Sequence, residues 1–567
     1  MDIESLFPKG ILRLELLMGF VNTVGANFVQ INFTEAAAPS GSYFQGSRYG
    51  KGEVGEFVII EGQTSLVLGR VVEVKAAEEY QNTDALGRIQ LLGSISMENL
   101  KVTAGVESYP RLGDKVYAAP HALVALIPVL MDQLNDEQVT LSIGSVDVAL
   151  ESKVYLKPEK LFGRHLAILG STGGGKSWTT AKILDECLKF KSKLILLDPT
   201  GEYRGFEIND DTIHVHLASP IETADGSKHC ALPPASFQES DFIALFEPAG
   251  KVQGPKLRES IKSLRLAKLN PTEFPDGYVK KINQSKATYR TCLNKPEMLS
   301  KVDDPSQEFD VTNLVRQIYQ ECVYPTGGTQ SNPDNNSWGN ASNEFTYCLS
   351  LVTRIEAILK SPTMNCVFGG GDSLIDEIST FLSDGKKLLR IDLSGVSFEF
   401  KAREIISNAI GRYLLSKARG NQFTSSPLIV FLDEAHNFLG KHIGSEDSAA
   451  NLDAFELIAK EGRKFGLNIC MATQRPRDIT EGVLSQVGTM IVHRLTNDRD
   501  REVVERACGE IDRAASAFLP NLQPGEAAII GNDFPIPLTI QIAVPDTRPK
   551  SSGPNFQEHW RNEEDAG

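Results

Sequence analysis

The residues with the clearest chemical meaning form one uninterrupted segment: Gly170, Ser171, Thr172, Gly173, Gly174, Gly175, Lys176 and Ser177. They match the phosphate-binding pattern G-x-x-x-x-G-K-[ST] at every position. The glycines let backbone N–H groups close around phosphates, Lys176 would reach the β and γ oxygens, and the Ser177 hydroxyl would bind Mg²⁺. An apolar run precedes the segment, and a helical stretch begins at Trp178. The segment therefore predicts a site for ATP and Mg²⁺ that includes Trp178; a purely structural glycine turn is the alternative.

Two adjacent carboxylates form a second candidate. Asp433 and Glu434 directly follow the apolar run LIVFL at residues 428–432. Asp433 would hold Mg²⁺ through water, and Glu434 would orient or deprotonate the water that attacks the γ-phosphate. A helix cap followed by an acidic first turn is the alternative. Together with the glycine-rich loop, the pair predicts ATP hydrolysis rather than binding alone.

Three more polar residues lie where they could assist. Gln474 follows the next apolar run, so its amide could sense the γ-phosphate or position water, or could simply satisfy backbone groups. Arg463, just before that run, could reach a neighbouring subunit's nucleotide, although its local sequence favours a solvated arginine. Arg164, twelve positions before Lys176, is equally ambiguous.

Other reactive residues are less specific. Asp198 and Glu202 end the strand that follows the loop and would lie at the carboxyl edge of the sheet, with a turn or capping role as the competitor. His214 and His216 share a strand face without a third ligand nearby, which favours ordinary strand histidines over a metal site. The eight cysteines are scattered without a CxxC, so we expect buried thiols rather than disulfides or zinc.

The elements that would position these residues alternate between strands and helices. Short apolar runs occur in the order 165–169, 193–197, 388–393, 428–432 and 467–472. Nearly continuous apolar strands that alternate with helices are typical of a parallel sheet covered on both faces. The fold class predicted for this part is α/β.

The first 120 residues have a different pattern. Short β-branched runs at 56–60, 66–74 and 88–95 are separated by glycines, and a turn at 110–114 leads into 115–117. Closely spaced strands of this kind favour a small barrel.

Residues 235–365 interrupt the alternating series. Leu257, Ile261, Leu264 and Ala267 follow helical spacing, which predicts a mostly helical insertion. The basic residues interleaved with them would give the helix a basic face: Lys256, Arg258, Lys262, Arg265 and Lys268. Residues 325–343 are rich in Gly, Asn and Ser and predict an exposed loop, and the polar residues after Pro545 predict a mobile tail.

The composition of the 567 residues, with 41% hydrophobic and 23% charged side chains, is that of a globular protein of several domains. A net charge of −15 counts against a protein that coats nucleic acid over its outside, but not against a few basic loops in a channel. The longest apolar run, 122–131, is about half of what a membrane span needs and contains Pro128. The amino-terminus lacks the pattern of a signal peptide, so we expect a cytoplasmic location and no membrane association.

Taken in order, these segments resemble the HerA/FtsK superfamily of P-loop ATPases, and HerA in particular. The resemblance rests on the barrel-like GEFVIIEGQTSLVLGRVVEV and then on RHLAILGSTGGGKS, LLDPTGEY, IDLSGV, IVFLDEAHNFL, EGRKFGLNICMATQRP and LQPGEAAIIG. It covers most of residues 50–545 and is weakest in the insertion. It implies a RecA-like ATPase core with an amino-terminal β-barrel domain (1–155), a core in two parts (156–234 and 366–545), a helical insertion (235–365) and a flexible tail (546–567).

The resemblance also implies an assembly. HerA proteins form homohexameric rings with nucleotide between subunits, so Arg463 would act on the neighbour's ATP and Arg164 on its own. Asp198 and Glu202 would belong to the edge of the active site. Proteins of this family translocate double-stranded DNA and work with a partner, such as a NurA-like nuclease or, in antiphage defence, a sirtuin-like NADase or another nuclease. Candidate DNA contacts in the channel are Lys441, Lys464, Arg475 and Arg477, each of which is otherwise an ordinary surface charge.

The leading hypothesis is therefore an ATP-driven double-stranded DNA translocase that serves a partner nuclease or antiphage defence effector. The alternative is an ATP-binding ring scaffold that assembles and activates an effector enzyme without obligatory translocation. A conjugative or secretion ATPase is a third possibility, disfavoured because no membrane anchor is evident and the amino-terminal barrel favours HerA. Stimulation of ATP hydrolysis by DNA would distinguish the first two.

Overall fold

The computed structural model describes residues 14–33, 42–44, 47–50, 52–62, 65–76, 85–133, 137–146, 152–217, 226–439, 441–443, 450–508, 517–550 and 556. The chain divides into two compact units, which we describe separately. Unit 1 comprises residues 1–191 and 468–567, and unit 2 comprises residues 192–467. Most of the tail expected after residue 546 lies outside the described residues.

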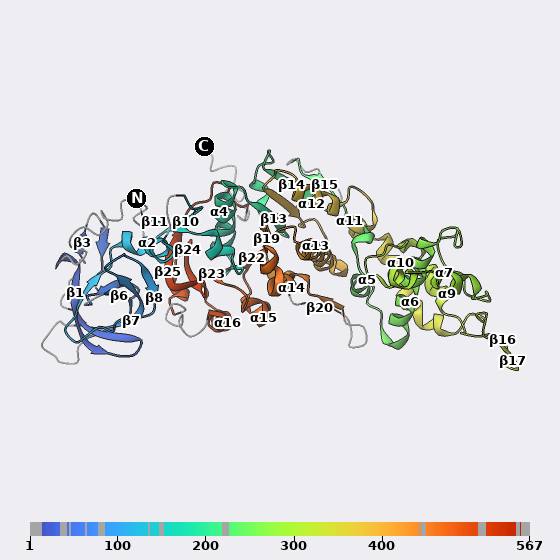
Figure 1. Ribbon diagram of the computed structural model, residues 1–567, viewed down its shortest axis with the longest axis horizontal. Coiled ribbons are helices and arrows are strands. Elements are labelled where there is room, and N and C mark those ends of the chain that lie inside the picture. Colours follow the sequence, from blue (N-terminus) through green and yellow to red (C-terminus); the bar gives the residue numbers. More distant parts are fainter. Residues whose placement is uncertain are drawn as a thin grey trace, which may run out of the picture. The chain divides into compact units, whose positions relative to one another are not determined.

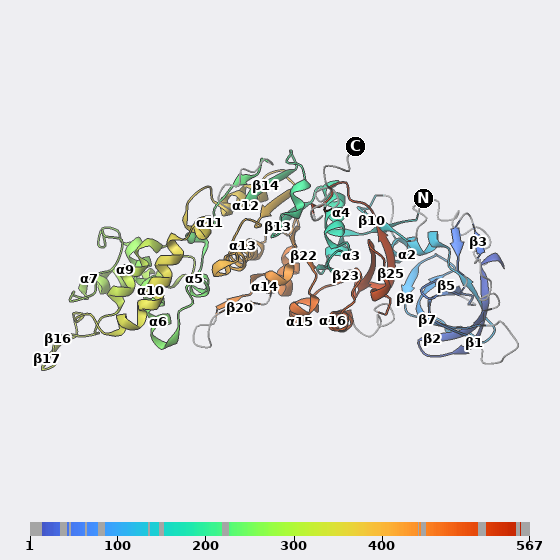
Figure 2. The same cartoon turned by 180° about the vertical axis from the view of Figure 1, so that it is seen from behind.

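Unit 1 begins with a closed antiparallel barrel (Figures 1 and 2). Six strands form it: β1 Leu17–Val24, β2 Phe28–Phe33, β5 Phe57–Ile60, β6 Ser65–Ala76, β7 Ala85–Ser96 and β9 Lys115–Ala118. The barrel closes where β2 pairs with β7, from Phe28 opposite Gln90 to Phe33 opposite Ala85. β8 (Val102–Ala104) extends β7 outside the ring. Alternate side chains such as Val29, Ile31 and Phe33 fill its core, which confirms the predicted barrel.

The longest apolar run forms a buried helix rather than a membrane span. This helix is α2 (His121–Asp132), and Pro128 lies inside it. Among the described helices, none combines the length and apolar character that crossing a membrane needs.

A second sheet of unit 1 carries the glycine-rich loop. Its strands lie in the order β11 (Lys153–Leu156), β10 (Leu141–Ser145), β25 (Phe534–Ile542), β24 (Glu526–Gly531), β23 (Thr489–Val492), β12 (Leu166–Leu169) and β22 (Leu467–Thr473). β12 runs parallel to both β22 and β23. From β23 outward the pairing is antiparallel, because β24 and β25 form a hairpin. The predicted runs at 165–169 and 467–472 are therefore parallel strands, and the antiparallel strands at the outer edge were not among the predicted runs.

The sheet of unit 2 is parallel throughout. Its strands lie in the order β19 (Leu428–Leu432), β13 (Lys193–Asp198), β18 (Leu388–Asp392), β14 (Thr212–His216) and β15 (Lys228–His229). All five residues of β18 are buried, as expected for a strand covered on both faces. Helices α12 (Leu374–Ser383), α13 (Ala402–Arg419) and α14 (Ala454–Glu461) belong to the same unit.

The insertion is mostly helical, as predicted. It contains α5 (Glu239–Phe246), α6 (Gly250–Leu269), α7 (Ala287–Leu293), α8 (Met298–Asp303), α9 (Leu314–Glu321) and α10 (Glu344–Lys360). The predicted apolar stripe of α6 is buried at Leu257, Ile261 and Leu264.

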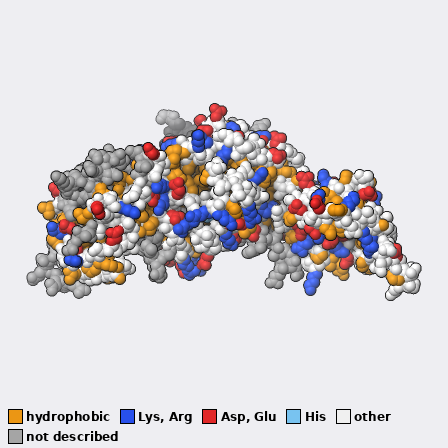
Figure 3. Space-filling model, viewed as in Figure 1, with side chains coloured by type: hydrophobic (Ala, Val, Ile, Leu, Met, Phe, Trp, Pro, Cys, Tyr) orange, Lys and Arg blue, Asp and Glu red, His pale blue; other side chains and the backbone are white. Residues whose placement is uncertain are grey.

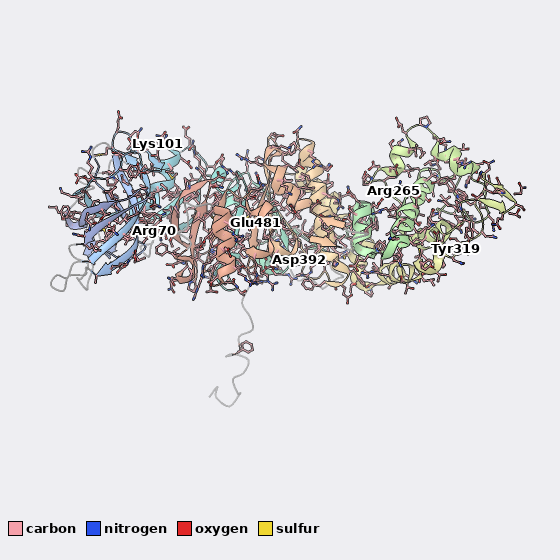
Figure 4. The ribbon with its side chains drawn as sticks, turned by 90° about the horizontal axis from the view of Figure 1, so that it is seen from below. Arg70, Lys101, Arg265, Tyr319, Asp392 and Glu481 are labelled. Carbon is pink, nitrogen blue, oxygen red and sulfur yellow. The ribbon has the colours of Figure 1, made fainter. Side chains whose placement is uncertain are left out.

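Two details of the insertion differ from the prediction. Arg265 does not belong to a basic surface: it is 1% exposed, and its guanidinium donates to the carbonyl oxygens of Val302, Pro305 and Gln307 (Figure 4). The last turn of α8 and the loop after it present three backbone acceptors, and arginine has the donors to satisfy them. The segment expected to be a loop at 325–343 contains a small hairpin of β16 (Gly327–Thr329) and β17 (Asn332–Asp334).

All eight cysteines are buried free thiols. His214 and His216 lie on β14 and are also buried. Within the described part of the chain no group of His, Cys, Asp and Glu could hold a metal ion by the usual clustering of three or more ligands.

Candidate nucleotide-binding loop and carboxylate cluster

In unit 1 the glycine-rich loop connects β12 to α4 (Lys176–Leu188), which is the strand–loop–helix arrangement of a phosphate-binding loop. Gly173 and Gly175 have φ of +76° and +114°, which residues with a Cβ rarely adopt. Gly175 immediately precedes the helix, so the first N–H groups of α4 have no intrahelical partner. The loop therefore has the backbone conformation, and leads into the helix N-terminus, that anion-binding loops use.

His493 and Arg494, which follow β23, pack against this loop. The backbone N–H and the Oγ of Ser171 both donate to the carbonyl oxygen of Arg494, at 3.0 and 2.7 Å. A Cβ added to Gly170 would lie 2.6 Å from the Cβ of His493. A Cβ added to Gly175 would lie 3.1 Å from Cε1 of the same histidine. Glycine is thus required here for close packing on His493 as well as for phosphate access.

His493 was not recognised in the sequence. Its ring is buried, with Nε2 2.8 Å from Thr179 Oγ1 on α4 and Nδ1 2.8 Å from the carbonyl oxygen of Glu526. Burial lowers the pKa of His493 to about 4, the Glu526 carbonyl raises it somewhat, and the charge of Lys176 lowers it further. A neutral imidazole therefore supports the loop at physiological pH.

Two hydrogen bonds join predicted residues at the loop. Lys176 is buried, and its Nζ donates to the carbonyl oxygen of Ser171 at 3.1 Å. Thr172, on the exposed tip, donates its hydroxyl to Oε1 of Gln474, which follows β22. The parallel pairing of β12 with β22 explains this contact, because the carboxyl ends of both strands lie at one edge.

Other predicted residues of unit 1 have different surroundings. Arg164 precedes β12, and its Nε lies 3.2 Å from Asp533 Oδ1. Arg475 immediately precedes the short helix η9 (Pro476–Asp478), and Arg477 lies within it. Both are exposed, 3.7 and 3.9 Å from carboxylate oxygens of Asp478. None of these interactions joins an arginine to the glycine-rich loop.

In unit 2, four carboxylates gather at the carboxyl ends of neighbouring strands; we call Asp198, Glu202, Asp433 and Glu434 the carboxylate cluster. Asp198 ends β13 and Asp433 follows β19, and these strands are parallel neighbours. Asp433 is buried and accepts a hydrogen bond from Thr200 Oγ1 at 3.2 Å. Burial, and then the negative charges of Asp198, Glu434 and Glu202, raise the pKa of Asp433 well above its usual range.

Asp198 has a buried arginine as its partner. Arg390, fully buried on β18, donates from Nε to Asp198 Oδ2 at 2.8 Å and from Nη2 to Asp392 Oδ2 at 2.8 Å. The other oxygen of Asp198 accepts the backbone N–H of Gly201 at 2.7 Å, so Asp198 shapes the loop that carries Glu202. Although burial alone raises the pKa of Asp392, Arg390 and hydrogen bonds from Ser394 bring it below its usual range. Figure 4 labels Asp392 in this unit.

Glu202 and Glu434 are held differently. Oε2 of Glu202 is buried and has no hydrogen-bond partner within the described part of the chain. Glu434 has φ of +47°, a left-handed conformation that costs about 1–2 kcal/mol in a residue with a Cβ. His436 Nδ1 lies 3.2 Å from its Oε2. Strained backbone at a carboxylate is common at functional sites.

The cluster has the donor set that Mg²⁺ prefers, since hard divalent cations bind carboxylate oxygens. A cation there would relieve the repulsion that raises the pKa of Asp433 and would give the unpartnered oxygen of Glu202 a partner, directly or through water. Asp433, and through water Glu202, would hold it. Within the described part of the chain these residues do not form a closed set of three or more protein ligands, so they fit a magnesium ion that takes its other ligands from water and nucleotide phosphate.

The remaining predicted residues of unit 2 lie on its surface. Arg463 and Lys464 are exposed in the short helix η8 (Gly462–Phe465), and Lys464 Nζ lies 3.7 Å from Glu461 Oε2. The side chain of Lys441, at the start of β20 (Lys441–Ile443), lies outside the described residues. Figure 3 shows acidic and basic side chains interspersed over the visible face rather than one extended basic surface.

Two family models match this chain. The model of the central domain of helicase HerA matches residues 141–412, and the model of the HerA-like helicase C-terminal domain matches residues 422–520. The chain belongs to the HerA family. The two models together include the glycine-rich loop, the carboxylate cluster and the helical insertion, so the resemblance drawn from the sequence is confirmed.

Relatives of the HerA family match along nearly their whole length. A probable helicase of Methanocaldococcus jannaschii is 23% identical, with 95% of this chain and 94% of the relative covered. The proteins named DNA double-strand break repair helicase HerA from Sulfolobus acidocaldarius and Sulfurisphaera tokodaii are 22% and 24% identical, each with 89% of this chain and 92% of the relative covered. Among solved structures, the bacterial conjugative coupling protein TrwBdeltaN70 has a TM-score of 0.43 and 13% identity, over 74% of this chain and 93% of that one. That structural likeness is too distant to say more.

Proposed function

We propose that this HerA-family chain is the ATPase subunit of an ATP-driven motor for double-stranded DNA. The observation that carries the proposal is the presence in one chain of a phosphate-binding loop with a buried lysine and of a carboxylate cluster in which burial and neighbouring negative charges raise the pKa of Asp433. A loop alone would suffice for binding nucleotide; hydrolysis also needs a cation site and a group that handles water. We infer that both sets of residues serve the hydrolysis of ATP.

Each residue would then have a defined task. The loop N–H groups and Lys176 bind the phosphates, and Ser177 and Asp433 hold Mg²⁺, which when bound neutralises charge on the phosphoryl oxygens. Glu434 orients a water molecule toward the γ-phosphorus and accepts its proton as the bond to ADP breaks. Gln474, already in contact with Thr172, reports or stabilises the γ-phosphate. Asp198 and Glu202 shape the edge of the site.

We further propose that six copies form a ring. The exposed position of Arg463 suits a finger that completes a neighbour's site, where such arginines stabilise charge on the transferred phosphoryl group. Arg164 would act within its own subunit. Lys441, Lys464, Arg475 and Arg477 remain candidates for contacts with the DNA backbone, and a nuclease or defence effector would supply the second activity. The name DNA double-strand break repair helicase, carried by several relatives, supports DNA as the polymer.

One observation favours the alternative of a scaffold ring that activates an effector. Three of the four candidate DNA contacts, Lys464, Arg475 and Arg477, already lie within 4 Å of acidic groups, and the chain has a net charge of −15. Phosphate binding depends on available cations and weakens with salt. A ring of this kind would hydrolyse ATP to change its assembly rather than to move DNA.

Measuring ATP hydrolysis with and without linear double-stranded DNA, together with the mass of the particle, separates these functions. A hexamer whose hydrolysis rises several-fold with DNA, and falls back as salt increases, supports the motor. Lys176→Ala is the control for contaminating ATPase and should abolish both rates. A hexamer that hydrolyses ATP at one rate with or without DNA would refute the motor and leave the scaffold.

A further inference from the structure

The first turn of α4 exposes a large aromatic side chain directly after the phosphate-binding loop. Trp178 is adjacent to Ser177 and is 37% exposed, whereas the residues that follow it in the helix, Thr179 to Cys187, are buried. An exposed indole leaves a large apolar surface in water. It lies one residue beyond the predicted Mg²⁺ ligand, in the first turn of the helix into which the loop leads.

A second planar side chain approaches the indole from the chain beyond β25. The backbone N–H of Thr547 donates to Asp185 Oδ2 on α4 at 3.1 Å, which fixes this segment along the helix. The exposed guanidinium of Arg548 then lies with its carbon 6.0 Å from the centroid of the Trp178 ring. Both α4 and residues 546–548 belong to unit 1. The C-terminal segment thus brings a cation to the one exposed aromatic side chain of the helix.

The distance between the Arg548 guanidinium and the Trp178 ring bears on what could bind there. At 6.0 Å from the ring centroid, the guanidinium carbon is at the outer limit of a direct cation–π contact, so the two groups are neighbours without being closely stacked on each other. Both indole and guanidinium planes stack on any nucleobase face.

We propose that Trp178 and Arg548 form the nucleobase subsite of this ATPase and hold a purine between them by stacking. The inference rests on the proposed function, because it requires that the loop binds a nucleoside triphosphate. Stacking recognises the π-face of the base rather than its edge. The subsite therefore accepts adenine and guanine alike and holds the smaller pyrimidines less tightly.

Fluorescence of Trp178 tests this directly. The chain has three tryptophans, Trp178, Trp338 and Trp560, so the full-length variant Trp338→Phe/Trp560→Phe leaves Trp178 as the only indole. With Mg²⁺ present, ATP and GTP should quench its emission, and inorganic tripolyphosphate should occupy the loop without quenching. Equal quenching by tripolyphosphate and ATP, or a signal that follows protein concentration rather than nucleotide, would overturn the subsite and assign Trp178 to a subunit contact.

Binding constants give the second arm. Trp178→Ala and Arg548→Ala should each weaken ATP about 10-fold and leave tripolyphosphate unchanged, while Trp178→Phe keeps most of the affinity. Lys176→Ala should weaken both ligands. If wild type binds neither ligand, the proposed function fails; if it binds ATP normally in both alanine variants, only the base subsite fails.

Discussion

In the helical insertion the carboxylate of Glu321 is buried beside a cation, whereas the carboxylate of Asp433 is buried beside three other carboxylates. Oε2 of Glu321 accepts from Lys281 Nζ at 2.6 Å, and its Oε1 accepts from Ser263 and Gln317. Both Glu321 and Lys281 are nearly inaccessible to solvent. Asp433, equally buried, has no ion pair with a described residue.

We interpret Glu321 as a carboxylate with a structural role and Asp433 as a carboxylate that binds a ligand. A buried charge is tolerated when a partner and hydrogen bonds satisfy it. Glu321 meets that condition within the chain, so it explains only how α6 and α9 stay together. Asp433 does not, and the missing charge is positive, which is what a magnesium ion supplies. Four predictions test this difference between buried groups.

Removing the cation of the insertion should give the largest loss of stability. Lys281→Met leaves Glu321 buried without its partner, and breaking a buried pair costs about 3–5 kcal/mol. Chemical denaturation should show this loss, and Lys281→Met/Glu321→Gln should recover most of it because no charge is left uncompensated. ATP hydrolysis per folded molecule should not change. If Lys281→Met is as stable as wild type, the two carboxylates do not differ as proposed.

The second prediction concerns His493, whose imidazole is buried without a charge. Its pKa is about 4 in the folded protein and about 6.5 in an unfolded chain, so the unfolded chain binds the proton first as the pH falls. Stability should therefore decrease between pH 6.5 and pH 4, by about 3 kcal/mol in all. His493→Gln lacks this contribution, and its unfolding free energy should vary less over the same window. Identical pH dependence in the two proteins would contradict a buried neutral imidazole.

Asp433→Asn should stabilise the protein in the absence of nucleotide and Mg²⁺. The raised pKa of Asp433 means that its charged form is disfavoured in the fold, so stability is lost as the pH rises from the carboxyl's ordinary pKa toward the folded value. Each unit of that shift corresponds to about 1.4 kcal/mol. Thermal melting at neutral pH should show a gain for Asp433→Asn, and added Mg²⁺ should stabilise only wild type. Equal Mg²⁺ stabilisation of both would place the cation elsewhere.

The smallest effect concerns the backbone of Glu434. Glycine adopts its left-handed conformation without the Cβ cost, so Glu434→Gly should be more stable than Glu434→Ala by about 1 kcal/mol. Both variants lose the carboxylate, which makes the pair a matched comparison. Equal stability of the two variants would contradict a strained left-handed backbone at residue 434.

The sequence could predict the features that neighbouring residues determine. The loop at 170–177 and the pair Asp433–Glu434 are contiguous motifs that directly follow apolar runs, so the sequence placed both at the ends of strands. Gln474 was placed at the loop because adjacent parallel strands end at the same edge, and its contact with Thr172 agrees.

His493 and Arg390 were missed because their partners lie far away in the chain. His493 supports the loop only because β23 pairs with β12, and Arg390 reaches Asp198 only because β18 pairs with β13. A signal did exist for Arg390, which is a charged residue in the otherwise apolar run Leu388–Ile391. Pairing order among five or more strands is not encoded in any local pattern, so neither role followed from spacing.

Hydrolysis of Mg²⁺-ATP by Glu434→Gln, measured beside its affinity for ATP, tests the central claim that the carboxylate cluster takes part in ATP hydrolysis. The substitution keeps the size of the side chain and removes the group that accepts a proton from water. We predict that ATP affinity stays within a few-fold of wild type while the turnover rate falls by about 10²-fold or more. Turnover equal to wild type would contradict the account, because the cluster would then have no part in the reaction.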